Sequence, residues 1–298
     1  MLRKLTLLLA LILLAMRTIA EVPRQCFPPG LALPSGWTEP YEAHRVIGNL
    51  YAIGAADLGV FLITTNEGHI LINTGLEDST HWVKANIAAL ELEFQDIRVL
   101  LTTQAHFDHA AALAEIKLLT GAQMLATPGD TPVLLDGGVS DAQFGHCLDF
   151  RFPPVTVDGE LSDGEEIKLG NTTLKTHHHP GHTAGSASYS MIVREDDRDY
   201  RVLIANMGNI NQGKRLSGNP TYKVVARDFA QTFNQQRDMW VDIWVAAHGS
   251  QYGLARKYKP GQAYSAKTFY DPQGFKTEVR RLERLYREQL AFEGAEVP

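Results

Sequence analysis

Cysteine is scarce in this chain of 298 residues, which contains only Cys26 and Cys147. Both cysteines lie outside the histidine motifs described below, so we do not count either as a metal ligand. In an oxidising compartment they can pair, but their separation in sequence says nothing about their distance in space. The sequence is therefore compatible with a disulfide and equally with a free, buried thiol at Cys147.

An excess of positive charge is also absent. Asp and Glu number 34 against 28 Lys and Arg, which gives a formal net charge of −6 at pH 7. No run of basic residues rises above the background, whereas proteins that bind nucleic acid or anionic lipid usually carry a basic patch. We therefore expect neither nucleic acid nor a lipid surface as the main partner.

Long hydrophobic runs are missing except at the N-terminus, where Arg3 and Lys4 precede the apolar run Leu5–Met16. Because a transmembrane helix needs about 20 apolar residues, this run is too short for a membrane anchor and fits a secretory signal peptide over residues 1–20. Cleavage removes Arg3, Lys4 and Arg17 but no acid, and so lowers the net charge from −6 to −9. We predict a secreted, periplasmic protein with no membrane attachment after cleavage.

No linker rich in proline or glycine divides the rest of the chain, so we treat residues 21–298 as a single domain. Short β-like runs alternate with segments that have the apolar spacing of helices. Strands followed by helices, twice over, favour an α/β fold of two stacked β-sheets with helices outside. The predicted strands span residues 49–55, 59–65, 69–75, 96–103, 122–127, 166–170, 172–179, 186–193, 200–206 and 242–249, and the predicted helices span Asp78–Leu92, His109–Leu119, Lys223–Gln236 and Phe275–Leu290.

One segment, TTQAHFDHAA at residues 102–111, concentrates potential metal ligands where a strand passes into a helix. Side chains alternate along an extended chain, so Gln104, His106 and Asp108 point to one side. The turn into the helix aims His109 separately. Such an arrangement can serve two adjacent metal ions.

Two later segments each bring one more histidine to a turn at a strand end. His182 follows a Pro-Gly bend in HHHPGHTAGS, and His248 precedes a glycine in WVAAHGSQ. Imidazole and carboxylate donors suit zinc, which keeps an open position at catalytic sites. A histidine in the run 177–179 can support a ligand without binding metal itself. We expect the remaining histidines to be solvated surface residues: His44, His69, His81 and His146.

The order of these motifs resembles the metallo-β-lactamase superfamily, and within it the third subclass. The resemblance covers nearly the whole chain after the leader, through GNLYAIGAADLGVFLITTNEGHILINTG, DGGVSDAQFG, HHPGHTAGS, VLIANM, DIWVAAHGSQ and YSAKTFYDPQGF. The glutamine together with IANM most resembles the GOB-type branch. The resemblance implies an αββα sandwich with two mixed sheets and a site for two zinc ions. It implies Gln104, His106 and His182 as ligands of the first ion, and Asp108, His109 and His248 as ligands of the second.

The resemblance also implies an activity: a monomer that hydrolyses the amide of penicillins, cephalosporins and carbapenems through a zinc-activated water, and so gives antibiotic resistance. Asp108 would be the catalytic residue, because it both binds the second zinc and positions the water. The predicted substrate contacts are Met207, Asn209 and Lys214, the last as a cation that meets a substrate carboxylate. Because Gln104 offers a neutral amide oxygen, less basic than imidazole, we expect the first site to hold zinc more weakly.

Two alternatives remain. The same fold can hydrolyse another cyclic ester or amide, but relatives with that chemistry carry an aspartate that bridges both metals after the strand RVLIA. This chain has Asn206 and Met207 there, and neither an amide nor a thioether bridges two zinc ions well. The second alternative is a catalytically silent, zinc-binding periplasmic protein in which Gln104 marks a dead site. The presence of all five other ligands argues against it.

Overall fold

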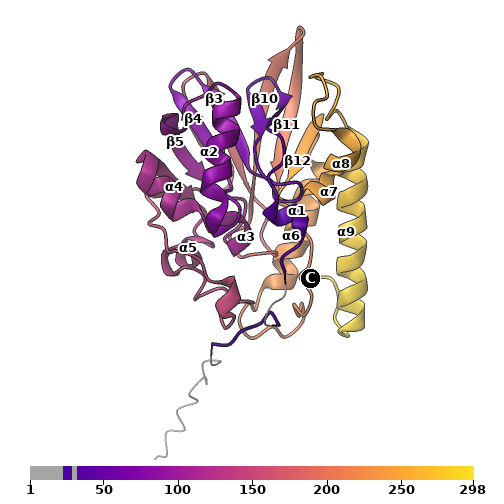
Figure 1. The fold of residues 1–298 in the computed structure, drawn as a ribbon. Helices are drawn as coiled ribbons and strands as arrows, with labels where there is room; N and C mark the ends of the chain where they lie inside the picture. Colours follow the sequence, from indigo (N-terminus) through magenta and orange to yellow (C-terminus); the bar gives the residue numbers. More distant parts are fainter. Residues whose placement is uncertain (1–22, 29–31) are drawn as a thin grey trace, which may run out of the picture.

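The computed structural model describes residues 23–28 and 32–298, which form two β-sheets packed face to face with helices on the outer sides (Figure 1). This arrangement confirms the predicted αββα sandwich. The predicted signal peptide, residues 1–20, lies outside the described residues. Within the described part of the chain, no helix has both the length and the apolar character needed to cross a membrane.

The first sheet contains seven strands, which follow one another in the order of the chain. Neighbours from β1 to β4 are antiparallel, and those from β4 to β7 are parallel. The sheet is therefore mixed, as predicted. Its strands are β1 (His44–Ile47), β2 (Leu50–Ala52), β3 (Phe61–Thr65), β4 (Gly68–Ile72), β5 (Ile97–Leu101), β6 (Gln123–Ala126) and β7 (Gly159–Glu160).

The second sheet contains five strands in the order β12-β11-β10-β9-β8. Its neighbours are antiparallel except for β11 and β12, which run parallel. Its strands are β8 (Glu166–Leu169), β9 (Thr172–His178), β10 (Ala187–Glu195), β11 (Arg198–Ala205) and β12 (Ile243–Ala246).

Alternation along the inner strands of the first sheet places apolar side chains on both of its faces. In β3, Phe61 and Ile63 belong to the core between the sheets, whereas Leu62 belongs to the core beneath α2 (Thr80–Ala89) and α4 (Leu113–Thr120). The same split recurs in β4 and β5. Because the side-chain period of a strand is two, continuous apolar runs bury both faces.

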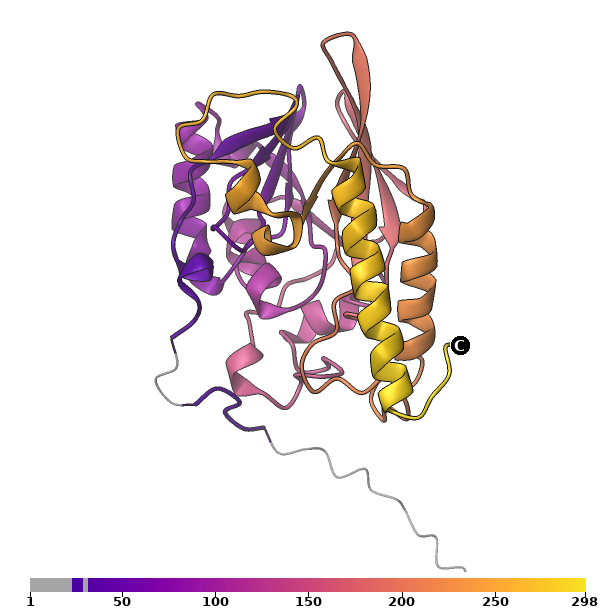
Figure 2. The same ribbon diagram turned by 90° about the vertical axis from the view of Figure 1, so that its right-hand side faces the viewer.

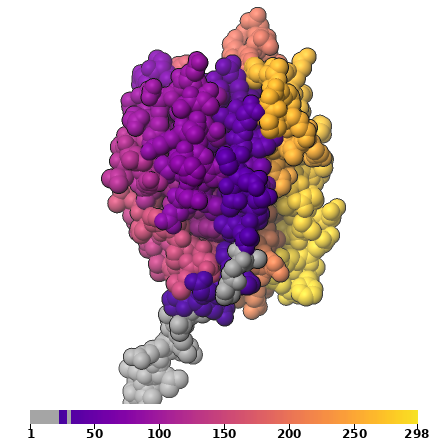
Figure 3. Space-filling model, in the orientation of Figure 1, coloured from indigo at the N-terminus to yellow at the C-terminus, as the bar shows by residue number. Residues whose placement is uncertain are grey.

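Two long helices cover the second sheet: α6 (Val225–Asp238) and α9 (Pro272–Phe292), which lie side by side (Figure 2). The Asp271 carboxylate accepts a hydrogen bond from the backbone N–H of Gly274 and so caps the start of α9. Both helices were predicted within a few residues of these bounds. On the face seen in Figure 3, the indigo segment that begins at residue 32 runs between the surfaces of the first and second halves of the chain.

The structure corrects several local predictions. The helix expected over His109–Leu119 is divided into α3 (Phe107–Ala110) and α4, which ends at Gly121 with a φ of 70°. His44 and His69, expected at the surface, are only 5% and 6% exposed. The His44 ring stacks between those of Tyr258 and Phe269, and His69 lies on β4, whose residues after Gly68 are all buried. The short helices α1 (Ser35–Thr38), α5 (Thr131–Asp136), α7 (Gly249–Tyr252) and α8 (Leu254–Lys257) were not predicted.

Candidate metal centre

The segment 102–109 leaves the end of β5 and is held in place by Asn73, at the end of the neighbouring strand β4. Asn73 adopts a φ of 63°, which asparagine tolerates better than most residues. Its side-chain oxygen lies 2.8 Å from the backbone nitrogen of Thr103 and accepts its hydrogen bond. The backbone carbonyl of His109 accepts a hydrogen bond from the N–H of Thr74. Both ends of the ligand segment are thus fixed to the sheet.

Asp108, His109 and His248 form one compact group, with potential ligand atoms within 4.8 Å of one another. Asp108 Oδ2 lies 3.3 Å from His109 Nε2 and 3.6 Å from His248 Nε2. Burial raises the pKa of the Asp108 carboxyl, but the neighbouring imidazoles outweigh this effect and hold the pKa below its usual range. The group therefore presents an ionised carboxylate between two imidazoles.

Gln104, His106 and His182, the predicted ligands of the first ion, lie beside these three residues. We call them the first group, and Asp108, His109 and His248 the second group. The rings of His106 and His182 lie edge to face with their centroids 4.9 Å apart. All three side chains are buried and, with Asp108 and His248, line one cavity of about 150 Å³. The structure thus brings together the six side chains that the motifs singled out, although His109 lies just behind the cavity wall.

Hydrogen bonds to the backbone select which ring nitrogen of two of the histidines faces the cavity. His182 Nδ1 lies 2.8 Å from the backbone oxygen of Asn209, and His248 Nδ1 lies 3.1 Å from that of Asp57. Since a carbonyl oxygen only accepts hydrogen bonds, each Nδ1 carries a proton. The lone pair of each Nε2 can then bind a cation.

Two carboxylates that the sequence analysis did not single out stand behind the histidines. Asp57 Oδ2 lies 3.7 Å from His248 Nδ1, and Asp141 Oδ2 lies 3.3 Å from His106 Nε2. Burial raises the pKa of Asp57, but hydrogen bonds from His248 and Ser250 outweigh it and hold the pKa at about 2. Burial likewise raises the pKa of Asp141, yet the His106 imidazole and backbone N–H groups keep it below the usual range. Carboxylates in this position orient a metal-binding imidazole and increase its basicity.

A third buried carboxylate, Asp130, ties the two ligand segments to each other. Its Oδ2 accepts hydrogen bonds from the Ala105 N–H at 2.8 Å and the Thr183 hydroxyl at 3.0 Å, and its Oδ1 accepts one from the Gly185 N–H at 2.9 Å. Burial raises its pKa to about 6 even though these donors oppose the shift. Asp130 fixes the distance between the segment of Gln104 and the loop of His182.

The three predicted substrate contacts lie in different surroundings. Asn209 lines the cavity. Met207 is 1% exposed and packs in the core between the sheets. Lys214 is also buried, and its ammonium donates hydrogen bonds to the backbone oxygens of Gly181 and His182, at 3.3 and 2.6 Å. Lys214 thus supports the loop of His182 in this structure.

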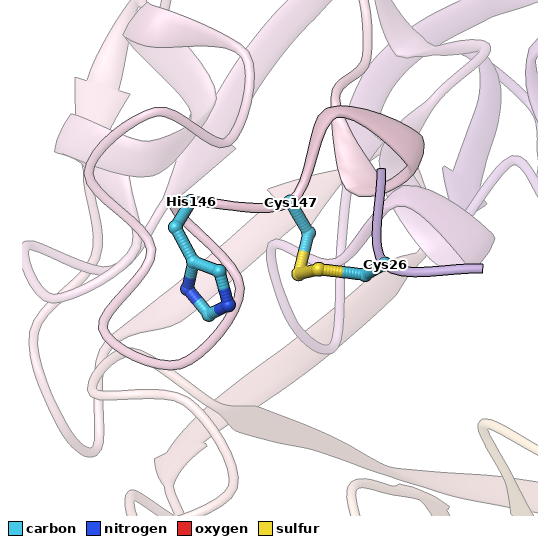
Figure 4. A group of neighbouring side chains, drawn as sticks. All are labelled: Cys26, His146 and Cys147. Atoms are coloured by element: carbon cyan, nitrogen blue, oxygen red, sulfur yellow. A yellow bond between two sulfur atoms is a disulfide. The ribbon is translucent and has the colours of Figure 1, made fainter. Parts of the chain in front are cut away.

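A disulfide joins Cys26 to Cys147, which settles the choice that the sequence left open. His146 lies beside it (Figure 4). All three side chains carry atoms that can bind a metal ion, but both sulfur atoms already form the disulfide bond. The crosslink and the Asp149 carboxylate, which accepts hydrogen bonds from the N–H groups of Cys26 and Phe27, hold the N-terminal segment against the loop that carries Asp141.

Sequence reasoning missed Asp57, Asp130 and Asp141 because a supporting carboxylate has no fixed spacing from the histidine it contacts. One signal was present: the motif DGGVSDAQFG, which carries part of the family resemblance, contains Asp141, and its Phe144 lines the cavity. The aromatic wall continues with Trp37, Phe107 and Phe150.

Comparisons with other proteins agree with this geometry. The sequence pattern described as Metallo-beta-lactamase superfamily matches residues 60–194. The metallo-beta-lactamase GOB-18 from Elizabethkingia meningoseptica is 41% identical, with a TM-score of 0.85 over 92% of this chain and 99% of its own. A beta-lactamase from Chitinophaga pinensis is 40% identical, with a TM-score of 0.85 over 89% of this chain and 100% of its own. The class B3 di-zinc metallo-beta-lactamase LRA-12 from an Alaskan soil metagenome is 43% identical, with a TM-score of 0.83 over 87% of this chain and 98% of its own.

A shorter similarity, of 32% identity over 95 residues, links the chain to a hydroxyacylglutathione hydrolase of Maricaulis maris. It spans 32% of this chain and only 29% of that enzyme. The solved relatives, in contrast, are matched along nearly their whole length. The chain therefore belongs to the metallo-β-lactamase superfamily, and its solved relatives there include enzymes of subclass B3.

Proposed function

We propose that this chain is a secreted, zinc-dependent β-lactamase that opens the amide ring of penicillins, cephalosporins and carbapenems and so confers antibiotic resistance. The observation that carries the proposal is the convergence of two ligand groups on one cavity. Solved relatives that match almost the full chain and are named as β-lactamases support it.

The buried nitrogens of His109 support a bound cation. Among the residues that the structure describes, neither ring nitrogen has a hydrogen-bond partner, although Nε2 lies 3.3 Å from Asp108 Oδ2, and His109 is fully buried. Leaving such atoms unpaired costs free energy, so a cation beside Asp108 would satisfy one of them and neutralise the carboxylate. The donor set of imidazoles, one carboxylate and one amide oxygen fits zinc.

Zinc bound here would lower the pKa of a coordinated water to about 7 and so supply a nucleophile at neutral pH. Asp108 is the proposed catalytic residue because its carboxylate reaches the cavity and stays ionised, so it can accept a hydrogen bond from that water and orient it. The aromatic wall limits access of bulk water, which strengthens electrostatic interactions in the cavity.

The substrate contacts follow from the same cavity. Asn209 lies on its wall, where its side chain accepts a hydrogen bond from Gln251 at 3.2 Å, so it is placed to meet a small substrate. We propose Met207 and Lys214 as contacts that depend on movement of the loop between them, since both are buried in this structure. We propose that the enzyme is a monomer, because the side chains of the site all come from one chain.

Hydrolysis of another cyclic ester or amide is the second candidate. The short similarity to a hydroxyacylglutathione hydrolase favours only the broader class of hydrolases that act on acyl compounds other than β-lactams. Against it stands Asn206, an amide where relatives with that chemistry carry a bridging carboxylate. Parallel assays on a penicillin, a cephalosporin, a carbapenem and an acyl-homoserine lactone separate the two. Preferred turnover of the lactone would reject the β-lactamase proposal.

Chelation followed by zinc rescue tests the proposed function. We expect the purified chain to hydrolyse nitrocefin, to lose that activity with its zinc, and to recover it after one or two equivalents of zinc are added. A chain that binds zinc but never turns over a β-lactam would instead be the silent zinc-binding protein. Fractionation of expressing cells tests the periplasmic location, and the disulfide supports export because such bonds persist in oxidising compartments.

A further inference from the structure

Asn206, the residue that follows β11, contacts the unusual ligand Gln104. Its side-chain nitrogen donates hydrogen bonds to the backbone oxygen of Thr103, at 3.0 Å, and to Oε1 of Gln104, at 3.3 Å. Asn206 and Gln104 are each 2% exposed. No bulk water therefore replaces these bonds, and the two amides meet directly behind the first ligand group.

The direction of both amides follows from the carbonyl of Thr103. A backbone oxygen only accepts hydrogen bonds, so the Asn206 atom beside it is the nitrogen. The opposite orientation would place Asn206 Oδ1 against two other oxygens. Since Nδ2 can only donate, the atom that Gln104 turns toward it is the amide oxygen.

The backbone of Asn206 is itself fixed on both sides. Its N–H donates to Ser188 Oγ at 2.9 Å, and its carbonyl accepts a hydrogen bond from Gln236 Nε2 at 2.7 Å. Ser188 Oγ in turn lies 2.6 Å from Nδ1 of His179. Every member of this network is buried, and a half-turn of the Asn206 amide would exchange its two hydrogen bonds for contacts between oxygens, which is costly.

We propose that Asn206 is a positioning residue for the first metal site: it holds the Gln104 amide so that its oxygen, and not its nitrogen, is presented to the cation. The oxygen has two lone pairs, so one can accept from Asn206 while the other binds metal. A histidine at position 104 would have no amide to orient, so Asn206 is needed as a positioning residue only when residue 104 is glutamine. The inference rests on the proposed function, since it takes the first group to be a zinc site.

A double-mutant cycle in zinc affinity tests the proposal with the full chain. The variants are Asn206→Leu, which keeps the size of the side chain but cannot donate, Gln104→His, and the two combined. Competition with a chromogenic chelator gives the affinities of both sites. We expect Asn206→Leu to weaken the first site by roughly 10-fold in the glutamine background, the scale of a lost supporting contact, and to change it little in the histidine background.

The second site serves as the internal control for folding, because zinc bound by Asp108, His109 and His248 should keep its affinity in every variant. Ser190→Ala is the matched control: Ser190 lies on the same strand β10 but contacts His177 and not Asn206, so its effect should be equal in both backgrounds. If the leucine side chain prevents folding, Asn206→Ala takes the place of Asn206→Leu.

Equal losses from Asn206→Leu in both backgrounds would overturn the inference and assign Asn206 a general packing role. A tighter first site would also overturn it, by showing that Asn206 competes with the metal for the oxygen. A wild-type chain that binds no zinc would reject the proposed function itself, which distinguishes that failure from the failure of this inference.

Discussion

The two ligand groups share one cavity but differ in how they are held. Asp108, His109 and His248 combine an ionised carboxylate with two imidazoles, whose nearest nitrogens lie 3.3 and 3.6 Å from Asp108 Oδ2. The first group has a neutral amide, Gln104, in place of a third strong donor. Its order comes from neighbours, the Asp141 carboxylate and the Asn206 amide, which contact His106 and Gln104. The comparison shows that the neutral amide of Gln104 is held by an uncharged neighbour, whereas the group of Asp108 contains its own charge.

Asp108→Asn should have the largest effect, because it removes the charge that holds the second group together. We expect loss of zinc from the second site and a fall in kcat/KM of ~10²–10⁴-fold, the range for a residue that handles a proton in the transition state. Nitrocefin kinetics and zinc content measure the two effects. The exposed Asp199→Asn is the control, and a mutant of Asp108 with normal zinc and normal turnover would refute its assigned role.

Gln104→His should reduce the difference in zinc affinity between the two groups. An imidazole is a more basic donor than an amide oxygen, so we expect the first site to bind zinc ~10-fold or more tightly while the second is unchanged. Chelator titration gives zinc content per chain as free zinc falls. Equal content in the two proteins would mean that the glutamine does not weaken the first site.

Asp141→Asn and Asp57→Asn should separate the groups, because each carboxylate supports a histidine of a different one. Loss of such support typically costs ~10–100-fold in metal affinity. We expect Asp141→Asn to weaken mainly the first site and Asp57→Asn mainly the second. The same titration measures both, and a loss shared equally between the sites would show that the two supports are not independent.

The smallest expected effect is on the stability of the zinc-free chain. Burial raises the pKa of Asp57, but its hydrogen bonds hold it at about 2, so its contribution is present above the unfolded pKa of 3.8 and is lost as the pH falls toward 2. Burial lowers the pKa of His248, but Asp57 outweighs this and raises it above 6.5. The contribution of His248 is therefore present below pH 6.5 and lost as the pH rises through the folded value.

The pair thus stabilises the folded state most between pH 4 and 6.5. Asp57→Asn should lower the free energy of unfolding by about 1 kcal/mol in this window, and by less at pH 3 or pH 9. Urea unfolding at these pH values measures the change. A loss of the same size at every pH would assign Asp57 a role that does not depend on charge.

The sequence predicted the layers of the fold and the grouping of Gln104, His106, Asp108 and His109, because strand alternation and the short spacing of H-x-D-H are local properties. His182 and His248 were added from turns at strand ends and from the family resemblance. Alternation also explains why the continuous apolar runs of β3 to β5 could be read as buried strands. The carboxylates that contact the histidines could not be predicted in this way. Asp57 meets His248 across 191 positions of sequence, and Asp141 meets His106 only after a loop folds back.

Histidine burial shows the same limit. His44 and His248 look alike in sequence, since each is a single histidine next to an apolar strand. In the folded chain, His44 stacks on Tyr258 with ring centroids 3.9 Å apart, whereas His248 faces the cavity. Only the packing of distant elements decides which histidine can reach a metal.

Anomalous diffraction from crystals of the chain with one equivalent of zinc tests the central claim most directly. The second group, which contains the charged Asp108, should bind zinc first. We therefore expect the first peak between Asp108, His109 and His248, and a peak beside Gln104 only as more zinc is added. A first peak beside Gln104, His106 and His182, or no peak in the cavity at all, would contradict the account.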